Sequence, residues 1–446
     1  MTQTHTTNNT QVWASNKYAK VVHEAIEAAS NELRSLSLKV HPCNTALSFD
    51  SELFKITNML ISISKRLTPI QIHDHPELAL KEFKAHAWLT GYLRSNGFAV
   101  EQGLSGLETA FVAEAGNPHG QVTIGICSEY DALPGIGHAC GHNLIAISGV
   151  ATALGLKAAI EQFGLPAKIK LFGTPAEERD AGKITMLNAG DFKDVEVCMM
   201  LHGANADVIH TQFLSLQTVT VEYFGKASHA STTPWEGINA LDAAMQVYTA
   251  IGLMRQQMPP DQRVHGIIQD GGQAANIIPQ YTRSVYTVRA PKYEQVKELK
   301  TKVEHIFEAA ARSTRCTHKV FWGKHIKDIQ TNGPLADKFE YLMNGLGLEY
   351  SPKLEQQSKL SGSTDMGNLT YAMPGIHPMY NIINLDGIDD NSLGLHTKEF
   401  AAAAADTVGH AATIRVAKAL AMTGVECILN SAFLRRVKDE FHSQDQ

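Results

Sequence analysis

The sequence contains 446 residues, of which 44% are hydrophobic and 19% are charged, and its formal net charge is -6. A chain of this length exceeds what one hydrophobic core usually organises, so we expect one large domain and a smaller one. The mild negative charge and the lack of a long Lys/Arg run argue against nucleic acid or an anionic membrane as the main partner, and they favour a small molecule.

Residues 1–71 form an N-terminal segment outside the two expected domains. The first residues, MTQTHTTNNTQ, lack the basic start and apolar core of a secretory signal. No uncharged apolar stretch reaches the ~18 residues that a membrane span needs. Six scattered cysteines suit reduced thiols better than a disulfide framework. These features predict a soluble, cytoplasmic protein.

Helix and strand patterns alternate between residues 72 and 212. Apolar residues recur at helical spacing over 83–93, and QVTIGIC at 121–127 is typical of a buried strand. A helix (154–163) and two strands (167–175 and 195–203) follow. This order predicts an α/β domain with a largely parallel sheet, whose active site lies outside the carboxyl ends of the strands.

The pattern changes between residues 213 and 323. Strand, helix, strand, strand, helix and strand follow one another, which is the β-α-β-β-α-β order of ferredoxin-like domains. Such a module can be inserted at an exposed loop of another domain. We therefore expect residues 72–212 and 324–430 to form one discontinuous domain around the insertion.

The segment SEYDALPGIGHACGHN brings Cys140 and His142 together in a Gly-rich loop after a strand. Thiolate and imidazole both bind zinc well. Alone, however, this C-G-H pattern is more typical of a buried cysteine beside a structurally bonded histidine. Other residues are needed before a metal site is predicted.

Glu177 and Glu178 follow an apolar strand in TPAEER. Adjacent carboxylates repel one another unless they are solvated or lie beside a cation. At a metal site, one can be a ligand and the other a general base. His202 ends another strand and His396 precedes the last helical region, so all of these groups can meet at one edge of the sheet.

Other enzyme classes fit the sequence less well. The loop GIGHACG departs from the dinucleotide-binding pattern G-x-G-x-x-G in its spacing, which leaves an oxidoreductase as a distant alternative. Ser62 and Lys65 have no companion motif of a serine hydrolase. A catalytically inactive binding or regulatory homologue also stays open, although such a protein is expected to have lost a ligand or the base.

Together these motifs resemble the aminoacylase and carnosinase type of zinc metallopeptidases, peptidase family M twenty. The subgroup most similar holds Xaa-Arg and β-alanyl-lysine dipeptidases and aminobenzoyl-glutamate hydrolases. The resemblance rests on HPEL, EYDALPGIGHACGHN, TPAEE, LHG, GKASHASTTPWEGINALDA, GGQAANIIP, GSTDMGN and His396. It implies a zinc-exopeptidase catalytic domain, with a central mixed sheet flanked by helices, and an inserted ferredoxin-like lid and dimerisation domain at 213–323.

The resemblance also implies the activity and the cofactor. The reaction would be hydrolysis of an amide or peptide bond in a dipeptide or N-acyl amino acid with a free carboxylate. Two divalent metal ions would be bound, zinc by default, with manganese or cobalt as alternatives. Cys140 would bridge the two ions and Glu177 would be the general base. The remaining metal ligands would be His142, Glu178, His202 and His396.

Four further roles follow from the resemblance in the inserted domain and a later loop. His229 would stabilise the tetrahedral intermediate, often in the partner subunit of a homodimer, and Asn276 would help hold the scissile carbonyl oxygen or the substrate. Arg289 would clamp the substrate carboxylate, because a guanidinium binds a carboxylate through two hydrogen bonds. Backbone N–H groups at Gly362 and Ser363 would cradle a carboxylate.

Residues 40–71 interrupt a stretch that is continuous in relatives of this kind. The codons of Val40, Gln71 and the pair Leu67 and Thr68 can carry splice donor, acceptor and branch signals. A translated intron is therefore one hypothesis for this segment. A genuine insertion is the other.

Overall fold

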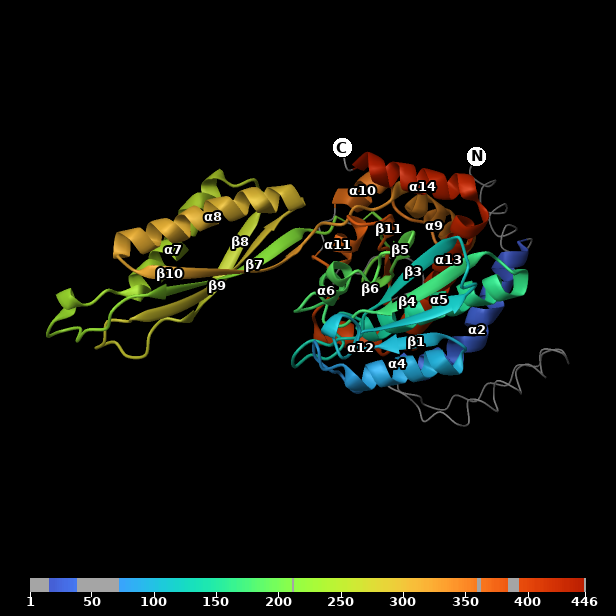
Figure 1. The fold of residues 1–446 in the computed structure, drawn as a ribbon, viewed down its shortest axis with the longest axis horizontal. Helices are drawn as coiled ribbons and strands as arrows, with labels where there is room; N and C mark the ends of the chain where they lie inside the picture. The colour runs from blue at the N-terminus through green and yellow to red at the C-terminus, as the bar shows by residue number, and fades with distance from the viewer. Residues whose placement is uncertain (1–15, 38–71, 211, 359–361, 384–392, 445–446) are drawn as a thin grey trace. The chain divides into compact units, whose positions relative to one another are not determined.

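The computed structural model describes residues 16–37, 72–210, 212–358, 362–383 and 393–444 (Figure 1). The chain divides into two compact units. The first comprises Met1–Thr211, Gln330–Lys359 and Leu369–Gln446, and the second comprises Gln212–Ile329 and Leu360–Asn368. The segment 40–71, with its hypothesis of a translated intron, lies outside the described residues.

A six-stranded mixed sheet forms the centre of the first unit, with the strand order β1-β2-β4-β3-β5-β11. The strands β3, β4, β5 and β11 are parallel, whereas β1 and β2 are antiparallel to their neighbours. The strands β6 and β12, which follow β5 and β11 in the chain, form a separate parallel pair. The bounds are β1 Ala99–Gln102, β2 Phe111–Gly116, β3 Val122–Ser128, β4 Ala167–Gly173, β5 Val197–Met199, β6 His202–Ala204, β11 Gly375–Ile376 and β12 Met379–Asn381.

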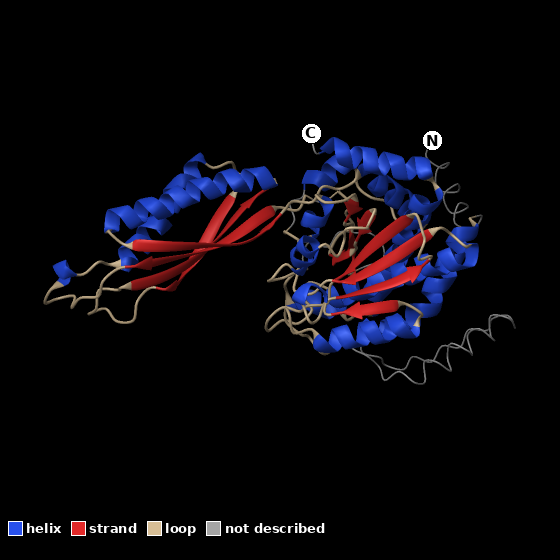
Figure 2. Ribbon diagram, in the orientation of Figure 1, coloured by secondary structure: helices blue, strands red, loops and turns tan. Residues whose placement is uncertain are grey.

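Helices surround this sheet (Figure 2). The central one, α5, is buried on nearly all faces because its residues are small or apolar all round. By length and composition alone α5 could cross a membrane, but 83% of its apolar window is buried inside the unit, as in the core helix of a globular domain. The helices are α2 Lys17–Ser37, α4 Phe83–Ser95, α5 His142–Phe163, α6 Gly182–Ala189, α9 Gly333–Gly345, α10 Lys353–Ser358, α12 Lys398–Ala404, α13 Thr407–Leu429 and α14 Ser431–Gln444. The short helix α11, Met366–Thr370, begins in the second unit.

The boundaries of this domain differ from the expectation at both ends. Helix α2, within the segment 1–71, packs on α5 and α13, and Ile26 lies against Gly155, where a larger residue would not fit. At the other end, Phe433 and Val437 of α14 are buried, so the unit continues past residue 430. In both cases apolar side chains complete the core of the α/β unit.

The second unit is a four-stranded antiparallel sheet, β10-β7-β9-β8, packed against α7 and α8. Its chain order is the predicted β-α-β-β-α-β. Side chains of β7 alternate between buried and half-buried positions, which gives the sheet one face toward the helices. The bounds are β7 Ser215–Phe224, α7 Ala240–Met254, β8 Arg263–Asp270, β9 Tyr281–Ala290, α8 Tyr293–Thr314 and β10 Thr317–Ile326.

This unit extends beyond the expected limit at residue 323. Asp328 accepts hydrogen bonds from the backbone N–H of Tyr293, at 2.8 Å, and from the side chain of Lys292, at 2.9 Å. The side chain of Asn368 bonds to the backbone of Lys327 and of His325, each at 3.0 Å. These contacts attach the strand end and the segment around residue 368 to the second unit.

Candidate metal centre

The site lies where the parallel strands β3, β4 and β5 of the first unit end. Glu129 follows the last residue of β3, the pair Glu177 and Glu178 comes after β4, and His202 comes after β5. Gly141, with a φ of 75°, turns the chain between Cys140 and His142, which begins α5. A left-handed φ suits glycine, so this turn explains the glycine of the C-G-H motif.

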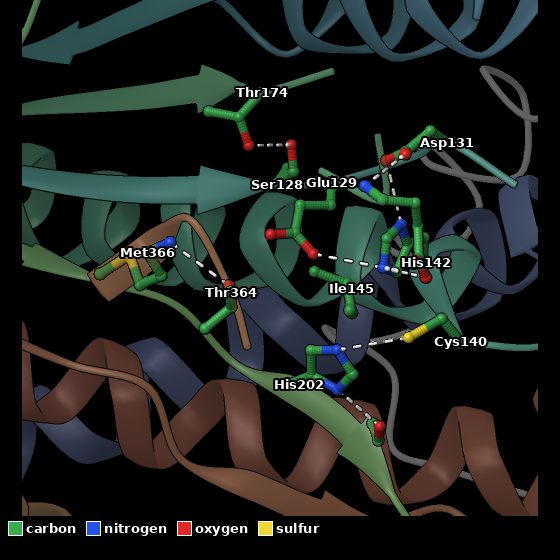
Figure 3. A network of polar contacts seen from close by, with 12 residues as sticks. Ser128, Glu129, Asp131, Cys140, His142, Ile145, Thr174, His202, Thr364 and Met366 are labelled. Carbon is green, nitrogen blue, oxygen red and sulfur yellow. Dashed lines mark hydrogen bonds and ion pairs between the residues drawn. The ribbon is translucent and has the colours of Figure 1, made fainter. Parts of the chain in front are cut away.

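Cys140, His142 and His202 form one buried group able to hold a metal ion. The sulfur of Cys140 lies 3.7 Å from Nε2 of His202 (Figure 3). Nδ1 of His202 pairs with the carbonyl oxygen of Gly203 at 2.7 Å, and Nδ1 of His142 pairs with Asp131 at 3.0 Å. Both histidines therefore present Nε2 to the group, in the manner of metal-binding histidines held by a neighbouring acceptor.

A second group able to hold an ion shares the same cysteine and contains Glu178 and His396. Nε2 of His396 lies 3.3 Å from Oε1 of Glu178. The backbone N–H of His396 donates to the carbonyl oxygen of Ala139 at 2.9 Å, which ties its loop to the C-G-H loop. Because Cys140 belongs to both groups, its thiolate can serve two ions at once.

Burial and charge are consistent with cations at this place. Burial raises the pKa of the Cys140 thiol well above its usual range, so a thiolate here requires a positive partner. Burial also acts to raise the pKa of Glu178, but the hydrogen bond and charges of His396 and His142 outweigh it and hold the pKa at about 2. Glu178 is thus a carboxylate at neutral pH.

The spacing of the ligand atoms indicates that a metal ion fits this site. Nε2 of His142 is buried and, among the described residues, has no hydrogen-bond partner. Two ligand atoms on one tetrahedral zinc ion are separated by roughly 3.3 Å for nitrogen and oxygen and roughly 3.6 Å for nitrogen and sulfur, as bond lengths of about 2.0–2.3 Å require. The separations of 3.3 Å and 3.7 Å seen here fit that geometry.

Glu177 is half-buried and forms a third group with Glu129 and His142, whose ligand atoms all lie within 4.8 Å of one another. The carboxylate predicted as the base therefore lies beside the atoms predicted as ligands. All six residues assigned to metal or base chemistry in the first unit come together: Cys140, His142, Glu177, Glu178, His202 and His396.

Other predicted residues belong to the second unit. His229 and Asn276 are exposed and adjacent, since the backbone N–H of Ala230 donates to the carbonyl oxygen of Asn276 at 3.0 Å. Nδ1 of His229 accepts a hydrogen bond from the backbone N–H of Ser231 at 3.3 Å. The roles of His229 and Asn276 toward the substrate stay predictions.

The three predicted carboxylate-binding residues also lie in the second unit. Arg289 is half-buried on β9, and burial lowers its pKa. The carbonyl oxygen of Gly362 accepts from the N–H of Leu214 at 2.9 Å, and Oγ of Ser363 is buried with no hydrogen-bond partner in the described parts of the chain. Their roles in binding substrate stay predictions.

Some residues of the site were given no role by the sequence. Asp131 holds Nδ1 of His142 and also accepts the backbone N–H of Glu178 at 3.1 Å. Glu129 lies two residues before it, at the strand end, which is the signal that could have identified both. His138, in the same loop, pairs instead with the carbonyl oxygen of Ile72 at 3.1 Å and belongs to none of the metal-binding groups found among the described residues.

An α/β domain with these ligand groups at its strand ends, together with a ferredoxin-like unit, defines a metal-dependent hydrolase. Residues 215–315 match the family model described as a peptidase dimerisation domain. The chain is 41% identical to the Xaa-Arg dipeptidase of Mus musculus over 83% of its own length and 87% of that protein. It is also 25% identical to a p-aminobenzoyl-glutamate hydrolase of Escherichia coli, over 84% of this chain and 91% of that one.

A solved structure supports the same fold. The YXEP protein of Bacillus subtilis, described as a dinuclear metal-binding peptidase from the M20 family, matches with a TM-score of 0.55 and 20% identity, over 77% of this chain and 94% of that one. The chain belongs to the M20 family of metal-dependent peptidases, which hydrolyse peptide or amide bonds.

Proposed function

We propose that this enzyme hydrolyses the amide bond of a dipeptide or an N-acyl amino acid whose leaving amino acid carries a free carboxylate. The observation that carries the proposal is Cys140, which belongs to two groups of metal-binding side chains at the strand ends of the α/β unit. Similarity to an Xaa-Arg dipeptidase over most of both chains supports the same reaction class.

The proposed cofactor is a pair of divalent ions, zinc by default, with manganese or cobalt as alternatives for this mixed donor set. Cys140 would bridge them, and His142, Glu178, His202 and His396 would complete the ligands. When bound, the ions would polarise the amide carbonyl and lower the pKa of a water molecule between them and the base.

Glu177 is the proposed general base. Its carboxylate lies within 4.8 Å of the nearest ligand atoms of His142 and Glu129, so it borders the proposed metal site. It would accept the proton of the attacking water and then deliver that proton to the departing amine. Glu178 is not proposed as the base, because its carboxylate is assigned as a metal ligand and lies 3.3 Å from Nε2 of His396.

The proposed substrates share a free carboxylate next to the scissile amide. The names of two relatives, an Xaa-Arg dipeptidase and a p-aminobenzoyl-glutamate hydrolase, both describe an amino acid joined through an amide bond. Arg289 is a suitable partner for the carboxylate because its Nε is buried and has no hydrogen-bond partner among the described residues. Gly362 and Ser363 are proposed to contact the same carboxylate, and Asn276 is proposed to hold the scissile carbonyl oxygen or the substrate.

A homodimer in the cytoplasm is the proposed working form. The family model that matches the second unit is described as a dimerisation domain. Its helix α7 exposes Met245, Tyr248 and Leu253, which offer an apolar surface to a second copy. A reducing compartment suits Cys140, whose thiol has to stay reduced to bind metal.

The test is hydrolysis of a substrate panel by purified protein of known metal content. The panel contains Xaa-Arg and Xaa-Lys dipeptides, p-aminobenzoyl-glutamate, N-acetyl amino acids and the carboxamide version of each. We expect cleavage of at least one carboxylate substrate and much slower cleavage of its carboxamide. Equal rates for carboxylate and carboxamide, or no cleavage of any compound by metal-loaded protein, would contradict the proposal.

A further inference from the structure

A fully buried ion pair lies next to the candidate metal centre, outside the ligand set predicted from the sequence. Glu129 follows β3 and Lys183 lies in the first turn of α6, and the side chains of both are completely buried. The ammonium of Lys183 donates to Oε1 of Glu129 in a close contact. Removing two charges from water costs more than their attraction usually returns, so stability alone does not explain the pair.

The second oxygen of Glu129 faces the metal site. Oε2 lies 3.4 Å from Nε2 of His142 and is buried with no hydrogen-bond partner in the described part of the chain (Figure 3). Nδ1 of His142 is paired with Asp131 at 3.0 Å, so Nε2 is the ring atom that faces Oε2 of Glu129. When a metal ion is bound, it would take the place of a proton between these two atoms, because a metal-binding imidazole must be neutral.

The spacing fits such a cation. Nitrogen and oxygen ligands of one tetrahedral ion lie roughly 3.3 Å apart when their bonds to it are about 2.0–2.1 Å. The separation of Glu129 from His142 is 3.4 Å, and that of His396 from Glu178 is 3.3 Å. Glu129, His142 and Glu177 also form a group able to hold an ion by the mutual distances of their ligand atoms.

We propose that Oε2 of Glu129 is a further metal ligand, on the ion held by His142, and that Lys183 fixes Oε1 so that the carboxylate binds through one oxygen only. Lys183 is a positioning residue in this arrangement. The inference rests on the proposed function, because it requires that His142 binds a metal ion. It adds a sixth protein ligand to the set of Cys140, His142, Glu178, His202 and His396.

The test compares zinc affinity in variants that remove the pair without leaving one buried charge unpaired. The double variant Glu129→Leu/Lys183→Met replaces both charged groups with apolar side chains of similar size. The matched control is Glu27→Gln/Lys418→Met, which removes another ion pair of the same unit, between α2 and α13. Zinc binding is measured by titration of metal-free protein against a competing chelator, and folding by circular dichroism and thermal unfolding.

We expect the double variant to bind one of its zinc ions roughly tenfold more weakly or worse, since even residues behind the ligands alter metal affinity by about that factor. The control should retain the affinity of the unaltered protein. In Lys183→Met alone, added zinc should raise the melting temperature more than in the unaltered protein, because the cation replaces the lost partner of Glu129. In cobalt-loaded protein, the visible absorption bands should change in the double variant and stay unchanged in the control.

Unchanged affinity of a folded double variant for both ions would overturn the proposal and leave the pair a purely structural feature. If the double variant does not fold, the cobalt spectrum of Glu129→Gln, which keeps the size of the side chain, decides the matter. A spectrum identical to that of the unaltered protein would then overturn the proposal. Failure of the unaltered protein to bind metal would instead contradict the proposed function, so the two failures are distinguishable.

Discussion

Each proposed ligand side chain is held by a neighbouring group in a way that leaves one of its atoms able to bind metal. Asp131 occupies Nδ1 of His142 and Gly203 occupies Nδ1 of His202, while Nε2 of each ring faces the metal-binding group. The side chain of Glu178 meets His396, and its backbone N–H is held by Asp131. Such support fixes the direction of each ligand before a metal binds.

Glu177→Gln should abolish turnover while both metal ions remain bound, because the amide has the size of the carboxylate but cannot accept the proton. Cys140→Ala should lose metal instead. Rates and metal content are measured on the same protein samples. Near-normal activity of Glu177→Gln would show that another group is the base, and equal metal loss in both variants would show that Glu177 is itself a ligand.

Arg289→Ala should raise KM for substrates with a free α-carboxylate, because losing a charge-assisted hydrogen bond costs about 2 kcal/mol. The matched control is Arg283→Ala, an exposed arginine on the same strand. Steady-state kinetics with a dipeptide and its carboxamide provide the measurement. A similar loss with both substrates, or in the control variant, would indicate another role for Arg289.

At the scale of elements, Glu82 links three segments beside the base. Its Oε1 accepts the backbone N–H of Leu80 and of Ala176, each at 3.0 Å, and its Oε2 accepts the hydroxyl of Thr109 at 2.7 Å. Ala176 has a φ of 61° and directly precedes Glu177. The carboxylate before α4 therefore holds the backbone from which the proposed base extends.

Burial raises the pKa of Glu82 from 4.5 to about 7, although its hydrogen bonds act in the opposite direction. The native state therefore binds this proton more tightly than the unfolded state does. The resulting stabilisation is complete below pH 4.5, is lost as the pH rises toward 7, and amounts to roughly 3 kcal/mol at most. Glu82→Gln cannot titrate and should lack this dependence.

Urea unfolding of metal-free protein at pH 5 and pH 8 measures the effect. The free energy of unfolding of the unaltered protein, relative to Glu82→Gln, should be larger at pH 5 than at pH 8. Comparison with the variant removes the contributions of all other titrating groups. The same difference at both pH values would show that Glu82 does not change its proton affinity on folding.

The sequence predicted some helices and strands better than others. The alternation of β7 and the order of elements in the ferredoxin-like unit predicted it well, because one face of its sheet is buried. The helix expected at 154–163 begins at His142 instead, since residues 142–153 are buried on all sides and show no helical period. The strand expected at 195–203 is divided into two short strands, β5 and β6. The two- and three-residue strands β11 and β12 depend on pairing with β5 and β6, which no local pattern indicates.

The sequence indicated some residues of the site but not others. Cys140, His142, Glu177, Glu178, His202 and His396 follow strand ends or precede helices, so the rule for open α/β sheets brought them together. Glu129 and Lys183 are 54 residues apart, and neither has a motif that indicates the other. Only the tertiary fold brings Lys183 of α6 to the carboxylate that follows β3.

At the scale of the whole molecule, the proposed homodimer makes a prediction about His229. If this histidine serves the neighbouring subunit, Glu177→Gln and His229→Ala proteins should each be nearly inactive, while a co-expressed mixture recovers activity. In a mixed dimer one site carries both defects and the other carries none. With random pairing about half of the dimers are mixed, so activity should approach roughly a quarter of the unaltered level.

Mixed dimers are verified by tandem purification with two different affinity tags, and activity is measured on the unfractionated mixture. The control is a mixture of Glu177→Gln with a chain that carries both substitutions, which contains no complete site and should stay inactive. Absence of recovery in verified mixed dimers would place His229 in the site of its own subunit.

The most direct test of the two-metal account is a zinc titration of metal-free protein in which bound metal and hydrolysis of an Xaa-Arg dipeptide are followed in the same samples. We predict that two zinc ions bind per chain, that hydrolysis appears only as they bind, and that Cys140→Ala loses both properties together. Full hydrolysis by protein whose metal has been removed, or by protein that binds no more than one ion with Cys140 intact, would contradict the account.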